Sequence, residues 1–203
     1  MTDQTARLLI VGPQGSGKGT QGVRIADAFG VPAISTGDMF RAAVAAGSDL
    51  GNQVKALIEA GNLVPDELTS AVVAERLGQD DAANGFLLDG YPRNLGQVAD
   101  LDAFLAARDE KIDAVIELNV PREESISRLT QRAREQGRTD DTEEVIANRL
   151  GIYERETAPI LDVYRERDVV DTIDGVGTLD EITERIVAAL EARGQVPDGR
   201  VPA

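Results

Sequence analysis

The stretch GPQGSGKGT, residues Gly12–Thr20, decides how this chain folds. It follows a short apolar run, Leu8–Val11, that is typical of a buried strand, and a helical pattern begins at Gly17. The stretch fits the pattern G-x-x-x-x-G-K, in which glycines allow backbone turns that point successive N–H groups at one phosphate. Lys18 adds a positive charge, and the helix start adds a favourable dipole. A flexible glycine-rich turn with an exposed lysine is the alternative, but the flanking strand and helix favour a phosphate-binding loop.

Apolar runs and helical patterns alternate along the rest of the chain. Further buried strands are expected at Val31–Ile34, Phe86–Asp89, Ala114–Leu118 and Val169–Ile173. The expected helices are Gly17–Phe29, Met39–Ala46, Leu50–Ala60, Asp66–Leu77, Leu95–Ala107, Glu123–Arg134 and Leu179–Ala192, with one long or two short helices over Glu143–Tyr164. This alternation indicates a parallel sheet covered by helices on both faces. Such sheets bind ligands beyond the carboxyl ends of their strands, where the loops at residues 12–18 and 89–93 can meet.

The composition limits the chemistry that this chain can perform. Its 203 residues include no cysteine and no histidine, which excludes disulfides, thiolate zinc sites, cysteine nucleophiles and a histidine base. Any reaction must then use lysine, arginine, carboxylates, hydroxyls, backbone N–H groups or a hard metal ion. That set favours phosphoryl transfer, in which positioning and charge stabilisation matter more than covalent chemistry. With 42% hydrophobic but only 3% aromatic residues, the core must consist mainly of Ala, Val, Leu and Ile.

The net charge of −15 bears on the partners of the protein. A strongly acidic surface repels nucleic acid and anionic membranes, so we expect neither as a partner. The apolar run at Leu8–Val11 is far too short for a signal peptide or a membrane span, which favours a cytoplasmic protein. Since no apolar repeat points to a dimer, we expect a monomer.

Asp89 and several arginines are the remaining candidates for a site. Asp89 ends an apolar strand, as a magnesium-organising aspartate does in phosphate-transfer enzymes, although a cap or turn residue is the alternative. Guanidinium groups bind phosphate oxygens through a bidentate fork. Arg128 and Arg132 lie four residues apart on one helical face, and the further candidates are Arg41, Arg93, Arg138 and Arg149. Surface charges paired with carboxylates are the better interpretation of Arg108, Arg122 and Arg193.

Five segments together resemble the adenylate kinase family. They are GPQGSGKGTQ (Gly12–Gln21), STGDMFR (Ser35–Arg41), GNLVPDEL (Gly61–Leu68), FLLDGYPR (Phe86–Arg93) with Gln97, and GRTDD (Gly137–Asp141) followed by Arg149-Leu150. The resemblance extends over Leu8–Val187. It implies an α/β, three-layer P-loop NTPase fold with a central parallel five-stranded sheet flanked by helices. It further implies one kinase domain over residues 1–193, with a helical insertion for the nucleoside monophosphate at about 35–64, a short lid at about 131–141 and a disordered tail at 194–203.

The resemblance also implies the reaction ATP + AMP ⇌ 2 ADP with Mg²⁺, and it assigns residues to each substrate. The ATP side would comprise Gly15, Ser16, Gly17, Lys18, Gly19, Thr20, Arg128, Arg132 and Gly177. The AMP side would comprise Thr36, Arg41, Asn62, Leu63, Val64, Gly90, Tyr91, Pro92, Arg93, Gln97, Arg138 and Arg149. The catalytic cations would be Lys18, Arg93, Arg132, Arg138 and Arg149, with Asp89 near Mg²⁺ through water. The pair Asp140 and Asp141 would anchor the closed lid, and no zinc is expected because this short lid lacks the cysteine cluster of some relatives.

Two other functions compete with this interpretation. A UMP/CMP kinase would share the loop and the arginines, but such relatives usually carry Ala in place of Thr36 and Asn in place of Gln97, so both positions favour AMP. A nucleotide-binding sensor without turnover is disfavoured because Lys18 and the arginines are all retained. The Gln97 amide can both donate and accept a hydrogen bond, which matches an adenine edge.

Overall fold

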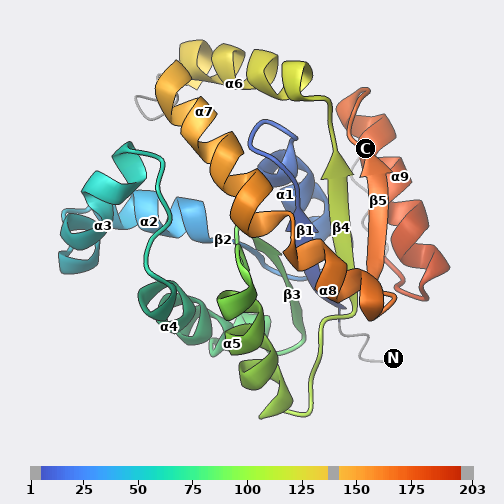
Figure 1. The fold of residues 1–203 in the computed structure, drawn as a ribbon. Helices are drawn as coiled ribbons and strands as arrows, with labels where there is room; N and C mark the ends of the chain where they lie inside the picture. The colour runs from blue at the N-terminus through green and yellow to red at the C-terminus, as the bar shows by residue number, and fades with distance from the viewer. Residues whose placement is uncertain (1–5, 137–141, 198–203) are drawn as a thin grey trace.

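Five parallel strands form the central sheet of the computed structural model, which describes residues 6–136 and 142–197 (Figure 1). The strands are β1 (Ala6–Val11), β2 (Ala33–Ser35), β3 (Gly85–Asp89), β4 (Ala114–Asn119) and β5 (Val170–Asp174), in the order β2-β3-β1-β4-β5. In the register of the sheet, Leu8 of β1 lies beside Leu87 of β3 and Ala114 of β4. Because the strands are parallel, the loops that follow them lie at the same edge of the sheet, where such folds bind ligands. Since β1 lies between β3 and β4, the loops after these three strands are neighbours there.

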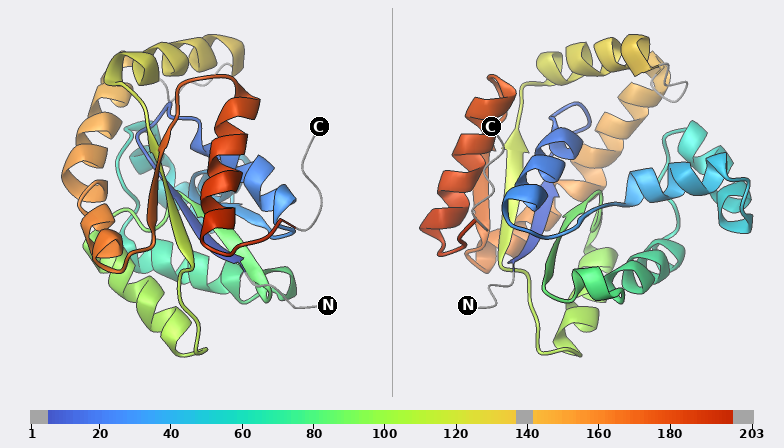
Figure 2. Two further views of the ribbon diagram at one scale, coloured as in Figure 1. Left: turned by 90° about the vertical axis from the view of Figure 1, so that its right-hand side faces the viewer. Right: turned by 180° about the vertical axis from the view of Figure 1, so that it is seen from behind.

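Helices cover both faces of the sheet, as the sequence predicts (Figure 2). One face carries α1 (Lys18–Ala28) and α9 (Leu179–Ala192), and the other carries α4 (Asp66–Leu77), α5 (Leu95–Ala106) and α8 (Ile160–Glu166). The remaining helices are α2 (Thr36–Ala45), α3 (Asp49–Glu59), α6 (Arg122–Gln136) and α7 (Glu143–Ile152). Figure 1 shows α2 and α3 standing away from the sheet on one side, while α6 and α7 arch over the carboxyl ends of the strands.

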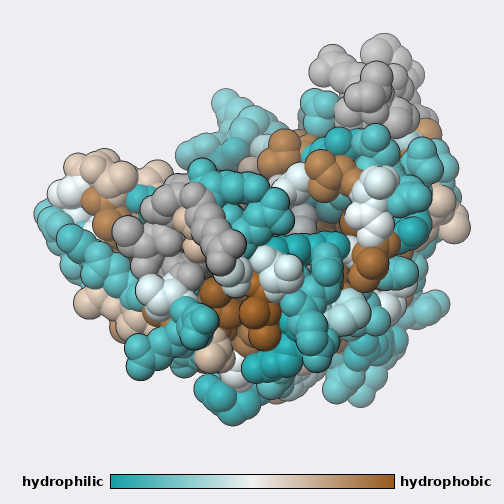
Figure 3. Space-filling view, turned by 90° about the horizontal axis from the view of Figure 1, so that it is seen from above, coloured by the Kyte–Doolittle hydropathy of each residue, from teal (hydrophilic) through white to brown (hydrophobic). Residues whose placement is uncertain are grey.

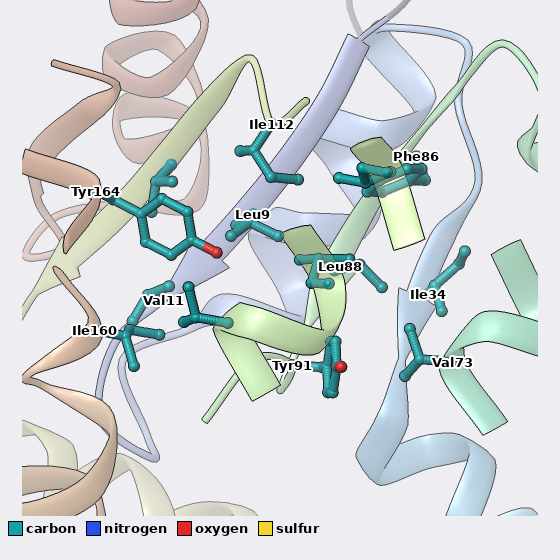
Figure 4. Packing of buried hydrophobic residues seen from close by; sticks show 14 of the residues in the cluster. Leu9, Val11, Ile34, Val73, Phe86, Leu88, Tyr91, Ile112, Ile160 and Tyr164 are labelled. Atoms are coloured by element: carbon teal, nitrogen blue, oxygen red, sulfur yellow. The ribbon is translucent and has the colours of Figure 1, made fainter. Parts of the chain in front are cut away.

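The alternation of side chains along β1 divides the core into two layers. Leu9 and Val11 pack with α4, α5 and α8, whereas Leu8 and Ile10 pack with α1 and α9. Each leucine or isoleucine buried in this way contributes about 1.5–3 kcal/mol relative to an exposed one. The core therefore consists mainly of aliphatic residues, as the composition predicts. Tyr164 is an exception: its ring is fully buried, its hydroxyl points toward Leu9 (Figure 4), and that hydroxyl has no hydrogen-bond partner among the described residues.

The predicted strands and helices are confirmed, with differences that have local causes. The helix expected from Met39 begins at Thr36, because the Ser35 side chain accepts a hydrogen bond from the Asp38 N–H and caps the first turn. The segment expected to hold one long or two short helices is α7, a π-helical stretch η2 (Tyr153–Thr157) and α8. A short 3₁₀ helix, η1 (Asp80–Ala82), was not predicted.

The expected lid and tail are described only in part, and residues 131–136 of the expected lid belong to α6. Residues 137–141, which include Arg138, Asp140 and Asp141, lie outside the described residues, as do residues 198–203. Residues 195–197 have no regular secondary structure. Within the described ranges, none of the helices has the length and apolar character that a membrane span requires. Seen from above in Figure 3, the surface is mainly hydrophilic, with hydrophobic residues in small separate patches.

Candidate active site

The glycine-rich loop joins β1 to α1 and passes closely under α6. Gly15 and Gly17 have φ angles of 83° and 95°, which only glycine adopts without strain. A Cβ atom on Gly15 would lie 2.4 Å from the Ser125 carbonyl oxygen, so no larger residue fits there. In the described part of the chain, no side chain caps the start of α1. Its first N–H groups therefore point into the loop, where an anion can accept their hydrogen bonds.

The Lys18 side chain folds back over this loop. Its Nζ donates hydrogen bonds to the carbonyl oxygens of Gly12 at 2.7 Å and Pro13 at 2.8 Å. Burial lowers the pKa of Lys18 to about 8, against the effect of the Asp89 carboxylate, while Arg93 and Arg132 lower it further. The ammonium group is thus held next to the loop in a place where a phosphate would restore its full charge.

Asp89 ends β3 beside the start of α1. Burial raises the pKa of this carboxyl, and the nearby Lys18 and Arg93 oppose that shift. Among residues 6–136 and 142–197, no group of three or more Asp, Glu, His or Cys side chains could hold a metal ion. A single carboxylate nevertheless suits Mg²⁺, which usually keeps several waters and binds through phosphates and one or two carboxylates. The donor set here fits a magnesium ion that arrives with a nucleotide.

Arg93 lies in the loop that follows β3. Burial lowers its pKa, although Asp89 opposes the shift, and its Nε donates a hydrogen bond to the Gly90 carbonyl oxygen at 2.7 Å. The Thr157 hydroxyl, from η2, donates to the Arg93 carbonyl oxygen at 2.8 Å. Gly90 thus holds one edge of the guanidinium, while Thr157 holds the backbone that carries it, so Arg93 is ordered before any substrate arrives.

The other cations come from the helices above and beside the sheet. Arg128 on α6 donates through Nε to Glu124 Oε1 at 2.7 Å, and Arg132 lies one turn further along. Arg149 on α7 donates to the Ile58 carbonyl oxygen at 3.3 Å, which links α7 to α3. Arg41 on α2 pairs with Asp38.

The residues expected to bind the acceptor lie between α2, α4 and the loop after β3. The Thr36 hydroxyl donates to the Gly90 carbonyl oxygen at 2.8 Å. Gln97 is only 1% exposed, and its Oε1 accepts a hydrogen bond from the Arg93 N–H at 2.8 Å. Its Nε2 donates to Asp66 Oδ1 at 2.7 Å.

One cavity of about 890 Å³ contains nearly all of these groups, a volume that suits small-molecule ligands. Of the candidates that the structure describes, it is lined by Gly15, Ser16, Gly17, Lys18, Gly19, Thr20, Thr36, Arg41, Asn62, Leu63, Val64, Asp89, Gly90, Pro92, Arg93, Gln97, Arg128, Arg132, Arg149 and Gly177. Tyr91 differs, because its side chain packs into the core (Figure 4). Its hydroxyl pairs with the Ser70 hydroxyl at 2.9 Å. Arg138 lies outside the described residues.

The structure adds residues to this site that the sequence did not indicate. Thr157 and Tyr153 of η2 line the cavity, as does Glu124 of α6. No local motif marks them, because their place depends on how α6 and α7 fold back over the sheet. The three arginines interpreted as surface charges lie elsewhere: Arg122 pairs with Glu154, Arg193 with Asp171, and Arg108 covers the Phe104 ring at 4.2 Å.

The parallel sheet, the glycine-rich loop and the ring of cations around one cavity define a P-loop phosphotransferase. Comparison with known proteins narrows this class: the sequence pattern of the family described as adenylate kinase matches residues 10–169. A protein named adenylate kinase from Leifsonia xyli subsp. xyli is 55% identical over 94% of this chain and 96% of its own. A protein named adenylate kinase from Clavibacter michiganensis subsp. michiganensis is 55% identical over 94% of this chain and 96% of its own length. Another protein of that name, from Kocuria rhizophila, is 52% identical over 91% of this chain and 98% of its own length. The chain therefore belongs to the adenylate kinase family.

Proposed function

We propose that this protein catalyses the reversible transfer of the terminal phosphoryl group of MgATP to AMP, which gives two ADP. One observation carries the proposal: Lys18 and five arginines, from elements far apart in the sequence, line the same cavity. The arginines are Arg41, Arg93, Arg128, Arg132 and Arg149. In-line transfer places negative charge on the donor, the moving group and the acceptor together, and such a set of cations stabilises that distribution.

On the donor side, the backbone N–H groups of Gly15–Thr20 would hold the ATP phosphates. Lys18 would leave the carbonyl oxygens of Gly12 and Pro13 and bind the β- and γ-phosphates instead. Arg128 and Arg132 would contact ATP from α6, and the backbone at Gly177 would lie beside its adenine. Magnesium would bind between the phosphates, with Asp89 reaching it through water.

On the acceptor side, Arg41 and Arg93 would bind the AMP phosphate, and the backbone of residues 62–64 with Gln97 would hold its base. An oxygen of that phosphate attacks the γ-phosphorus while the bond to the β,γ-bridging oxygen breaks, and ADP leaves with the electron pair. No general base is required, because the AMP phosphate is already anionic. A chain without histidine can therefore perform the reaction. Arg149, together with Arg138 of the expected lid, would bridge the phosphates during transfer.

Acceptor assays with AMP, CMP, UMP and GMP test this proposal against a UMP/CMP kinase. We expect AMP to have the highest kcat/KM, and faster use of CMP would contradict the proposal. Lys18→Ala should abolish turnover in a folded protein, while Lys111→Ala, an exposed lysine outside the cavity, should leave it unchanged. A wild-type protein that binds both nucleotides but forms no ADP would favour the sensor instead.

The partners in this proposal are ATP, AMP and ADP. The cytoplasmic location, the monomeric state and the absence of nucleic-acid or membrane partners remain predictions from the sequence. Sedimentation velocity at micromolar concentration tests the monomer directly, since a dimer would sediment as a species of twice the mass.

A further inference from the structure

The Gln97 amide has a fixed orientation in this structure. A backbone N–H can only donate, so the amide atom that faces Arg93 N at 2.8 Å must be the oxygen Oε1. A carboxylate can only accept, so the atom that faces Asp66 Oδ1 at 2.7 Å must be the nitrogen Nε2. Each of the two partners therefore fixes the orientation of the Gln97 amide independently, and both give the same orientation.

Asp66 is itself held in place for this contact. It is the first residue of α4, and its Oδ1 also accepts a hydrogen bond from Asn94 Nδ2 at 2.8 Å. Asn94 in turn caps α5 by accepting the Gln97 N–H through Oδ1 at 2.9 Å. Asp66, Asn94 and Gln97 thus form a closed set of hydrogen bonds between α4 and the start of α5.

After these two bonds, the amide retains one lone pair on Oε1 and one hydrogen on Nε2. Gln97 lines the cavity, so it offers a ligand an acceptor and a donor in a fixed order. The adenine edge carries the N6 amino donor beside the N1 acceptor. In a 6-oxopurine such as hypoxanthine both are reversed, with an O6 acceptor beside an N1–H donor. A freely rotating amide would match either base, whereas a fixed one matches only one of them.

We infer that Asp66 is a positioning residue that makes the acceptor site selective for 6-aminopurine over 6-oxopurine monophosphates, by preventing the Gln97 amide from turning over. A turned amide would place Oε1 against the Asp66 carboxylate and Nε2 against the Arg93 N–H. The bond to Asp66 is the charge-assisted one, and the only one of the two that a substitution can remove. This inference rests on the proposed function, because it concerns the base of the acceptor.

The test compares kcat/KM for AMP with kcat/KM for IMP, which differs from AMP at the 6-position and N1 only. In Asp66→Ala we expect the ratio of kcat/KM for AMP to kcat/KM for IMP to fall about tenfold, mainly through changes in KM. Asp66→Asn keeps an Oδ1 that can accept from Gln97 and Asn94, so its ratio should stay within about threefold of the wild type. Glu67→Gln is the matched control, since it removes the neighbouring exposed carboxylate from the first turn of α4.

The outcomes separate this inference from the proposed function. If the wild type does not phosphorylate AMP, the proposed function fails. If the wild type uses AMP but Asp66→Ala keeps the wild-type ratio, Asp66 does not set selectivity and the inference is wrong. Equal loss of both activities, with the ratio unchanged, would likewise show a purely structural role. Should Asp66→Ala be too unstable to assay, Asp66→Ser provides the same test, because its hydroxyl is too short to reach Gln97.

Discussion

Raising the pH from 7 to 9 should weaken the binding of a nucleoside triphosphate, because Lys18 loses its proton over this range. Burial places the pKa of Lys18 at about 8 in the nucleotide-free protein. The bound phosphates require the charged ammonium, so binding must supply a proton whenever the lysine is neutral. The sign follows: affinity is highest below the pKa of about 8 and falls as the pH rises through it.

The size of the effect follows from this pKa. The dissociation constant should increase by the factor 1 + 10^(pH − pKa), which is about 1.1 at pH 7 and about 11 at pH 9. The expected loss is therefore about tenfold, or about 1.4 kcal/mol. A terminal phosphate with a pKa near about 6 is ionised across the range, so its own titration cannot reproduce this dependence.

Isothermal titration calorimetry with a non-hydrolysable ATP analogue and Mg²⁺ measures the constant at half-unit steps of pH. Titrations at pH 8.5 in two buffers of different ionisation enthalpy should also show uptake of about 0.8 proton, the fraction of Lys18 that is neutral at this pH. Lys18→Arg is the control, because its guanidinium stays protonated and its curve should be flat. A flat curve for the wild type, or an equal decline in Lys18→Arg, would refute the reasoning.

Three further predictions concern single side chains. Tyr164→Phe should leave the free energy of unfolding unchanged or raise it by up to about 1 kcal/mol, because the buried hydroxyl has no hydrogen-bond partner among the described residues. A decrease of more than about 1 kcal/mol, measured by urea unfolding, would contradict this. Gly15→Val should lower the free energy of unfolding by about 1–3 kcal/mol and abolish nucleotide binding, since its Cβ would lie 2.4 Å from the Ser125 carbonyl oxygen. Nucleotide binding as tight as that of the wild type would contradict the loop geometry. Thr157→Val should cost about 1 kcal/mol of unfolding free energy through its lost bond to the Arg93 carbonyl oxygen, and unchanged thermal unfolding would exclude that contact.

The sequence by itself determined the phosphate-binding loop and the layers of the fold. Both depend on short-range rules: glycines at fixed spacing free the backbone N–H groups, and periods of two and 3.6 residues mark strands and helices. Nearly all of the described residues that the family resemblance names line one cavity. The sequence could not show that the Tyr91 side chain points away from the cavity and contacts Ser70. The direction of a side chain in a turn depends on the residues that pack against it.

Only the tertiary structure decided how the site groups are charged and oriented. The pKa of Lys18 depends on burial under segments distant in the chain, and on Asp89, Arg93 and Arg132. The orientation of Gln97 depends on Asp66, 31 residues earlier, and Arg93 is held by Thr157, 64 residues later. Such contacts are set by the packing of helices on the sheet, since short-range patterns carry no information about which distant side chains meet. The loop motif therefore predicts a phosphate site from the sequence alone. The charge of Lys18 and the base selectivity of the acceptor site are properties of the folded protein.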